Sequence, residues 1–293
     1  MRFIETKLFL LTLGLMTPLA QIFNEQFYGN YLNQIIIFAL PLLWPGIAHG
    51  SLDVLIARNN KIINNNNDTF LFLIIYISIP IIFFYTWIIF PNIIFMIFLL
   101  LSIFHFGLSD CITNKKVTEI LIRGGLVILL PFKFHLEKTI EIFGFFLVNE
   151  VFLMTISVYF NYIYIILVLL IFLNLSQNLN KLFSSHQNFS YLIEIIGLFF
   201  CFWFFEPLVS FFIYFCFLHS VRHLIDEKRN LKLSHKSLFF KTLPMTAITV
   251  IFFIILFFLF QNSPENLNIN YVVIGLSSLT VSHILLTSFT KKN

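Results

Sequence analysis

Residues 207–224 read PLVSFFIYFCFLHSVRHL, an apolar run long enough to cross a bilayer as a helix. It begins at a proline and ends in two histidines four residues apart, and similar apolar runs recur along the chain of 293 residues. Hydrophobic residues make up 59% of the chain and charged residues only 11%, whereas soluble domains average about 25% charged residues. This composition excludes a soluble globular, a disordered and a fibrous protein. Because the runs are continuous rather than alternating, they also argue against an outer-membrane barrel.

The chain therefore predicts an all-α, polytopic helical bundle in the membrane, with residues 1–293 forming a single transmembrane domain without an internal repeat. Proline and polar loops separate the apolar segments, because proline removes a helix donor and disfavours helix in the preceding residue. A mixed stretch at 135–150 suggests an interfacial helix. We expect about ten spans, at residues 7–23, 31–50, 69–90, 92–112, 117–134, 151–173, 190–205, 207–224, 238–260 and 268–289.

The distribution of Lys and Arg predicts the orientation of these spans. If ten spans are threaded from a cytoplasmic N-terminus, all 18 basic residues except Lys133 and Lys138 fall at cytoplasmic ends. We therefore expect both termini in the cytoplasm and the protein in the cell inner membrane. Arg2 and Lys7 before an apolar run resemble a signal sequence. Glu5 and the lack of a small-x-small site after the run lead us to expect a retained first helix.

The threading places five histidines and two aspartates at one depth in the membrane. Ionisable groups inside a bilayer are costly, so each of them is a candidate functional residue. They come from spans two, four, eight and ten, always from the cytoplasmic half. The set consists of His49, His105, His219, His223 and His283, with Asp53 and Asp110.

The spacing of these residues favours a metal site. His219 and His223 share one helix face, which suits a transition metal, although such a pair alone is more often a packing or hydrogen-bonding pair. The motifs His49-Gly50-x-x-Asp53 and His105-Phe106-Gly107-x-x-Asp110 nearly repeat each other. We therefore expect His49, His105, His219 and His223 to be the ligands of a shared metal. We rank His283 lower, as a fifth ligand, a supporting group or a pocket wall, because no carboxylate adjoins it in sequence.

The donor types limit the metal. Neutral imidazoles suit iron, zinc, copper and nickel, and the lack of sulfur ligands argues against a structural zinc or a copper–thiolate centre. A catalytic site with open positions is the better interpretation. Asp53 and Asp110 suit the role of acceptors for the second ring nitrogen of a ligand histidine. The alternative is that they pair with nearby cations, Arg58 or Lys115 and Lys116.

Four other polar residues are not expected at the metal. His186 and His235 lie in polar loops, where a solvated surface role is expected. His135 falls at the opposite membrane face in our threading. Arg222 lies between the paired histidines in sequence, so we expect it to point away from them as a cytoplasmic anchor or a partner of Asp226.

These motifs resemble those of the Brp/Blh family of membrane β-carotene 15,15'-dioxygenases, which supply retinal to microbial rhodopsins. The resemblance runs through almost the whole chain. It includes residues 48–53 (AHGSLD), 104–110 (FHFGLSD) and 219–223 (HSVRH), Arg123-Gly124 leading to Pro131 and His135, and Ser282-His283 at the end. Ala48 and Ser282 stand where the family more often has proline, but neither side chain is a metal ligand.

The resemblance implies an oxidoreductase that cleaves β-carotene with O₂ at the central double bond into two all-trans-retinal molecules. It implies one Fe(2+), held by the residues that correspond to His49, His105, His219 and His223. The product would pass to a microbial rhodopsin. The expected partners are thus β-carotene, O₂ and the lipid bilayer, with no nucleic acid. An apolar pocket for the polyene would be lined by Phe104, Phe106, Trp203, Phe211, Phe212, Tyr214 and Phe215, although most Phe side chains are ordinary core or lipid-facing residues.

Two other functions stay open at this point. A membrane desaturase or hydroxylase with two irons would use several histidine boxes, whereas this chain has a single His-x-x-x-His pair. A metal-ion or proton transporter would use the His/Asp cluster as a relay. Such a transporter should carry polar groups on to the far leaflet, and here little besides Glu194 and Glu206 does so.

Overall fold

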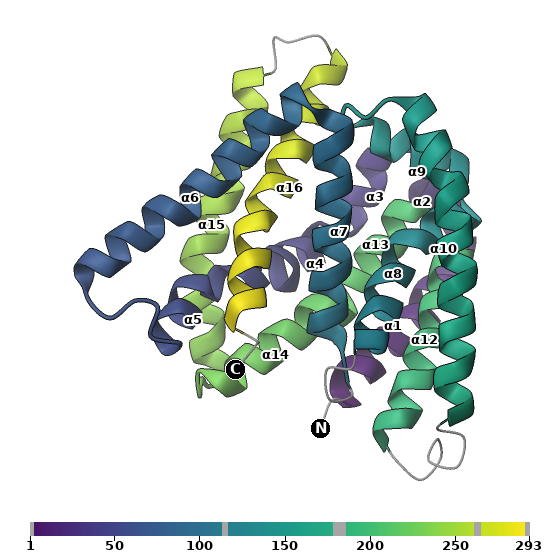
Figure 1. Ribbon diagram of the computed structural model, residues 1–293, viewed down its shortest axis with the longest axis horizontal. Helices are drawn as coiled ribbons and strands as arrows, with labels where there is room; N and C mark the ends of the chain where they lie inside the picture. The colour runs from purple at the N-terminus through teal and green to yellow at the C-terminus, as the bar shows by residue number, and fades with distance from the viewer. Residues whose placement is uncertain (1–2, 113–116, 178–185, 261–264, 291–293) are drawn as a thin grey trace.

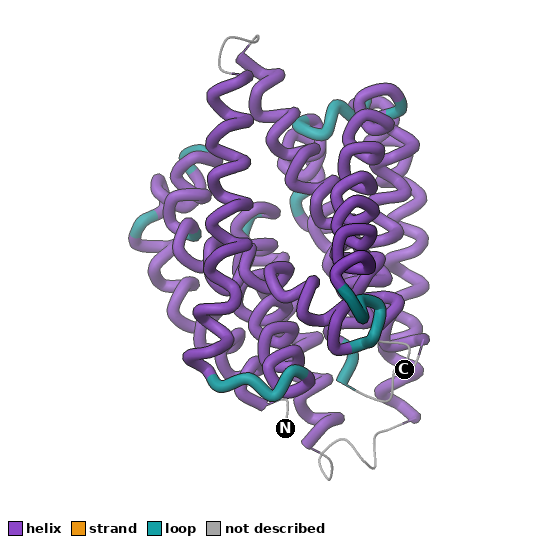
Figure 2. The backbone as a smooth tube through the Cα atoms, turned by 90° about the vertical axis from the view of Figure 1, so that its left-hand side faces the viewer, coloured by secondary structure: helices purple, strands orange, loops and turns teal. Residues whose placement is uncertain are grey.

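In the computed structural model every regular element among the described residues, 3–112, 117–177, 186–260 and 265–290, is a helix (Figures 1 and 2). The first half of the chain forms α1 Phe3–Ile22, α2 Asn24–Tyr28, α3 Tyr31–Ile37, α4 Ala39–Pro41, η1 Leu42–Gly46, η2 Ile47–Leu52, α5 Asp53–Asn59, α6 Asn66–Ile89 and α7 Pro91–Asp110. The second half forms α8 Val117–Phe134, α9 Leu136–Gly144, α10 Glu150–Gln177, α12 His186–Phe204, α13 Pro207–Tyr214, η3 Phe215–His219, α14 Ser220–Asn230, α15 His235–Phe260 and α16 Glu265–Thr290.

The all-helical membrane class is confirmed, and each predicted apolar segment lies in helical structure. Six helical stretches of the described chain are long and apolar enough to cross a membrane: 39–59, 66–89, 91–110, 150–176, 207–230 and 269–290. Other predicted spans are less suited to it. The helix α8 carries three charged residues, Glu119, Arg123 and Lys133, and the apolar part of α12 covers only 188–204. Because of these helices, the number of crossings stays a prediction.

Local sequence sets the helix ends. Pro91 and Pro207 stand in the first turn of α7 and α13, where their missing N–H is not needed. The side chain of Asn65 accepts a hydrogen bond from the backbone N–H of Asp68 and so caps α6. In the predicted interfacial stretch only the short helix α9 forms, with an exposed ion pair between Lys138 and Glu141.

The predicted span at 31–50 is not one continuous helix, which corrects that expectation. Trp44 has extended backbone angles (φ −146°, ψ 117°) between the pieces of the helix. Pro45 explains the break, because proline disfavours helix in the residue before it and donates no hydrogen bond itself. The chain resumes as the 3₁₀ helix η2, so His49 lies on a short, irregular turn.

The helix α7 lies at the centre of the bundle. It packs against α6 and α16 on one side and against α8 on the other, as Figure 1 shows. Gly107 and Gly124 allow the close contact with α8: a Cβ atom on Gly107 would lie 2.0 Å from the carbonyl oxygen of Ile120. A Cβ on Gly124 would lie 1.8 Å from that of Ile103. Small residues let membrane helices approach in this way, and here they bring the end of α7 against the start of α8.

The outer helix α6 is largely exposed. In the most apolar part of α6 only 11% of the residues are buried, so its large apolar side chains point outward. The first turn of α1 and the last described turn of α16 lie at the same end of the molecule in both views (Figures 1 and 2). The number of crossings and the side of the membrane on which this end lies stay predictions.

Candidate metal centre

Five histidine rings from four regions of the chain meet in the interior of the bundle. They are at most 7% exposed, and the centroids of neighbouring rings lie 4.8–5.6 Å apart. The cluster consists of His49 on η2, His105 on α7, His219 at the end of η3, His223 on α14 and His283 on α16. The depth predicted from the sequence is thus matched by lateral convergence of all five rings.

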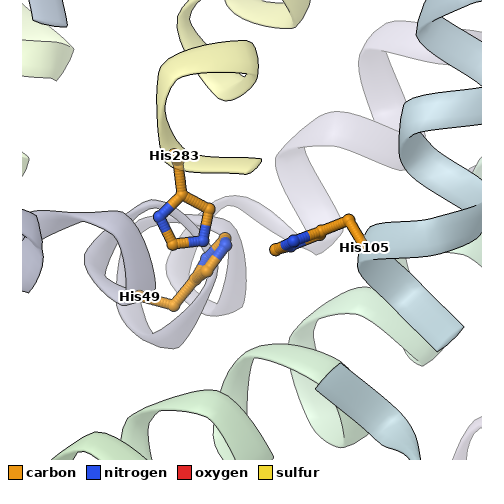
Figure 3. A group of neighbouring side chains, drawn as sticks. All are labelled: His49, His105 and His283. Atoms are coloured by element: carbon orange, nitrogen blue, oxygen red, sulfur yellow. The ribbon is translucent and has the colours of Figure 1, made fainter. Parts of the chain in front are cut away.

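Three of these rings lie close enough together to share a metal ion. One nitrogen from each of His49, His105 and His283 lies within 4.8 Å of the others, and Figure 3 shows the three rings converging. His219 and His223 border this trio: His219 lies 5.1 Å from the His105 ring, and His223 lies 5.1 Å from the His283 ring. A buried, all-nitrogen donor set fits a first-row transition metal. His283, which we ranked below the other four, therefore belongs to the centre of the cluster.

Polar neighbours at Nδ1 orient several of the rings. Nδ1 of His49 hydrogen-bonds to the backbone carbonyl of Gly46, and Nδ1 of His105 lies 3.3 Å from the hydroxyl of Thr287. When Nδ1 is held in this way, Nε2 is the nitrogen presented to a metal, as in most histidine-ligated sites.

Asp53 is the acceptor behind His283. Both of its carboxylate oxygens lie 2.9 Å from Nδ1 of His283, and the hydroxyl of Tyr76 donates to it at 2.5 Å. Nε2 of His283 is buried and makes no hydrogen bond among the described residues. Asp53 therefore does not pair with Arg58. The sequence missed this pairing because the carboxylate comes from the start of α5, far from His283 in the chain.

Asp110 takes the corresponding place beside His219. Its Oδ1 lies 3.4 Å from Nδ1 of His219, and its Oδ2 accepts a hydrogen bond of 2.6 Å from the hydroxyl of Tyr214. The cation beside Asp110 is Arg222, whose Nη1 lies 3.6 Å from Oδ1. The alternative partners Lys115 and Lys116 lie outside the described residues.

The expectation for Arg222 is wrong. Its side chain is fully buried, donates to the backbone carbonyl of Asp110 at 3.0 Å and pairs with Glu194. Asp226 instead faces Arg229 at 3.6 Å. The reason is that α14 is covered on several sides, so residues between the two histidines also face protein. The carboxylates of α7 and α12 neutralise the buried guanidinium.

Three further buried charges were not selected as site residues from the sequence, although Arg123 belongs to the family resemblance and Glu194 was noted as a polar group. Arg123 donates to Glu119 at 2.7 Å and to Glu194 at 2.6 Å, and none of the three is more than 1% exposed. A carboxylate within an apolar run was the available signal for Glu194. Glu119 and Arg123 lay at the start of a predicted span, where exposed charges are common.

The predicted pocket residues separate into two groups. Phe106 and Tyr214 lie beside the cluster, with ring centroids 4.9 Å and 6.0 Å from that of His219. Phe215 stacks on His219 at 5.8 Å, and Phe211 stacks on Phe215. Phe212 instead packs against Phe38. Phe104 and Trp203 are 53% and 59% exposed, so both side chains face outward in this structure.

The remaining histidines are placed elsewhere. His235 is exposed and contacts Lys228, as predicted for a surface residue. His186 begins α12, and its side chain lies outside the described residues. His135 follows the last residue of α8. Since helices rise about 1.5 Å per residue, it lies roughly 18 Å along the chain from Arg123, toward the other end of that helix.

The comparisons with known proteins agree on one family. A family model described as beta-carotene 15,15'-dioxygenase matches residues 9–291. A curated beta-carotene 15,15'-dioxygenase from uncultured marine bacterium 66A03 is 31% identical over 259 residues, which covers 83% of this chain and 89% of that protein. No solved structure matches the chain.

Proposed function

The chain belongs to the family of β-carotene 15,15'-dioxygenases, and from this premise we propose that it cleaves β-carotene at the central 15,15' double bond. The balanced reaction joins one O₂ to one β-carotene and gives two molecules of all-trans-retinal, each carrying one oxygen atom as its aldehyde. The observation that supports this proposal is the convergence of five buried histidine rings beside apolar aromatic side chains.

We propose that the histidine cluster holds one Fe(2+). Bound iron supplies a centre that can react with O₂ and so overcomes the spin barrier to direct reaction with an alkene. The ligands proposed are His49, His105, His219 and His223. The first two also belong to the trio of converging nitrogens, and their burial keeps bulk water from the site. Neutral imidazoles leave the charge of the metal uncompensated.

The carboxylates behind the rings orient them. Asp53 accepts from His283, whose ring packs 4.8 Å from that of His49, and Asp110 stands behind His219. We assign His283 the role of holding the cluster together. Iron content of single His→Ala variants tests this assignment: His283→Ala should keep part of its iron. If it loses all iron while one of the four proposed ligands proves dispensable, His283 replaces that residue in the ligand set.

The polyene is proposed to enter from the bilayer and to lie against the aromatic side chains beside His219. Phe106, Phe211, Tyr214 and Phe215 provide such a surface. Such an aromatic surface suits an apolar substrate, because it has no polar group that the bound polyene would leave without a hydrogen bond. Phe104 and Trp203, which face outward, would contact the substrate only on its way in.

The membrane arrangement is also proposed. Ten crossings with both termini in the cytoplasm would place the metal centre in the cytoplasmic half of an inner membrane, and the retinal formed there would be available to a microbial rhodopsin. The family assignment favours this oxygenase over a two-iron desaturase or a transporter. No feature of the described residues supports either alternative.

Expression in β-carotene-producing bacteria tests the function. Cells with the protein should lose orange colour and accumulate retinal, measured by chromatography of extracted pigments. Treatment of the purified protein with an iron chelator should stop retinal formation, and Fe(2+) should restore it. His235→Ala, which changes an exposed histidine, is the control and should behave as the parent. Unchanged β-carotene in cells that contain folded, iron-loaded protein would contradict the proposal.

A further inference from the structure

A network of five charged side chains lies inside the bundle beside the histidines. None is more than 2% exposed, and they come from α7, α8, α12 and α14. The members are Asp110, Glu119, Arg123, Glu194 and Arg222. Burying charges costs several kcal/mol per ion, and a buried pair gains little stability over an apolar one. A network of this size next to a metal centre therefore calls for a role other than stability.

Glu194 joins the members of the network. One carboxylate oxygen accepts from the hydroxyl of Thr6 on α1 and from Nη2 of Arg222. The other accepts from Nη1 of Arg123 at 2.6 Å. Each oxygen is thus engaged, and the carboxylate fixes both guanidinium groups at once. Because it binds side chains of three other helices, its position is determined by the whole bundle.

Arg222 connects Glu194 to the histidine cluster. Its Nη2 is held by Glu194, while its Nη1 donates to the Asp110 carbonyl at 3.0 Å and lies 3.6 Å from Oδ1 of the same residue. Tyr214 holds the other oxygen of Asp110. The Asp110 carboxylate thus has Oδ2 hydrogen-bonded to Tyr214, while Oδ1 makes charge contacts with Arg222 at 3.6 Å and with Nδ1 of His219 at 3.4 Å. A planar guanidinium can bridge two such partners, whereas a lysine ammonium cannot match both.

We propose that the Glu194–Arg222 pair is a positioning element of the metal centre: it fixes Asp110, and Asp110 fixes the orientation of the His219 ring. The proposal rests on the metal centre proposed above. It assigns neither residue a contact with substrate or metal. The competing role is a structural link between α12 and α14, which would hold the helices together without affecting the ring.

The double variant Glu194→Gln/Arg222→Gln separates these roles. It removes one positive and one negative charge, so the net buried charge stays the same. Arg123 keeps Glu119 as its partner, and Asp110 keeps Tyr214. The purified protein would be loaded with Co(2+), whose visible absorption reports the ligand geometry, and loaded with Fe(2+) for steady-state kinetics. We expect a shifted Co(2+) spectrum and a kcat lower by about 10–100-fold, the range for partners that orient ligands. The KM for β-carotene should stay unchanged.

Arg222→Lys is the second variant and decides the question if the double variant does not fold. It keeps the buried positive charge but cannot hold Asp110 and Glu194 together, so the same spectral shift is expected. Glu206→Gln is the matched control. Its carboxylate accepts from Gln34 at 3.1 Å at the start of α13, thirteen residues before His219, and the variant should give the parent spectrum and kcat.

A parent-like Co(2+) spectrum and parent-like kcat in folded Glu194→Gln/Arg222→Gln or in Arg222→Lys would overturn the positioning role. Loss of folding stability with an unchanged spectrum would show a structural link instead. The proposed function fails in a different experiment, because it would fail in the parent protein: no retinal with iron bound, or no metal bound at all. The two failures are therefore distinguishable.

Discussion

Replacing Asp53 by Asn changes one charge behind the histidine cluster and almost nothing else. The side chain is 3% exposed and keeps its shape. The carboxylate contacts Nδ1 of His283 with both oxygens at 2.9 Å and accepts from Tyr76 at 2.5 Å. An asparagine still offers one carbonyl oxygen to His283. The Tyr76 hydroxyl can rotate to accept from the new amide, so the main loss is the negative charge.

The expected magnitude follows from these contacts. A hydrogen bond to a charged group contributes about 1.5–3 kcal/mol, against about 0.5–1.5 kcal/mol for a neutral pair. The variant therefore loses roughly 1.5 kcal/mol of the interaction that holds His283. Since about 1.4 kcal/mol corresponds to a factor of ten, iron affinity should fall by at most about tenfold, the limit reached when the whole loss falls on the metal-bound state. That value lies at the lower end of the range for residues that orient ligands.

The assay is competition for Fe(2+) between the purified protein and a chelator of known affinity, together with retinal formation at saturating iron. Asp68→Asn is the matched control: Asp68 is half-buried near the start of α6, and its carboxylate accepts from the backbone N–H of Asn64 at 3.0 Å. Its iron affinity should equal that of the parent. Because Asp53 acts through His283, Asp53→Asn should add nothing once His283→Ala is present.

Two results would refute this reasoning. If Asp53→Asn binds iron as tightly as the parent, the carboxylate does not support the metal centre, and its contact with His283 is only packing. If the effects of Asp53→Asn and His283→Ala add, Asp53 acts by a route other than the His283 ring.

Other outcomes test the ligand set, the helix contact and the topology. His219→Ala and His223→Ala should each abolish retinal formation and bound iron, measured by pigment analysis and metal content. His135→Ala should keep its iron, because it lies toward the other end of α8; folded but iron-free protein would place it among the ligands. Gly107→Ala should lower the melting temperature in detergent, because its Cβ would lie 2.0 Å from a carbonyl oxygen of α8. Gly144→Ala, with nothing within 4 Å, should not. A reporter fused to the C-terminus should be active only in the cytoplasm; periplasmic activity would invert the topology.

The fold was predictable to the extent that it depends on local chemistry. Each apolar run forms helical structure because a bilayer leaves no other way to satisfy the backbone of a single segment. Two departures involve the site itself. The chain breaks at Trp44 before Pro45, and a π-helical turn spans residues 215–219. The proline at position 45 predicts the break, whereas no residue type predicts the π-helical turn, since a π turn depends on the packing around it.

The histidine cluster was predictable for a different reason. Depth in the membrane is a one-dimensional property. It is predicted for every side chain once the apolar runs are assigned as alternating crossings with the basic residues on the cytoplasmic side. Five histidines at one depth could therefore be selected before their lateral positions were known. Their neighbours depend on how the helices pack in the plane of the membrane, and the spacing of residues along the chain does not predict that packing.

Two partners in the site were missed because of that difference. The sequence offered no carboxylate near His283, yet Asp53 reaches it from another helix; the rank of His283 below the four proposed ligands stays a prediction. Arg222 was expected to be a cytoplasmic anchor or a partner of Asp226 because it lies between the paired histidines in sequence, yet it pairs with Glu194 and Asp110. In both cases a buried charge has its partner on a different helix. Intramembrane charges with no partner in sequence should therefore be interpreted as halves of inter-helix pairs, and such pairs identify the helices that enclose a site.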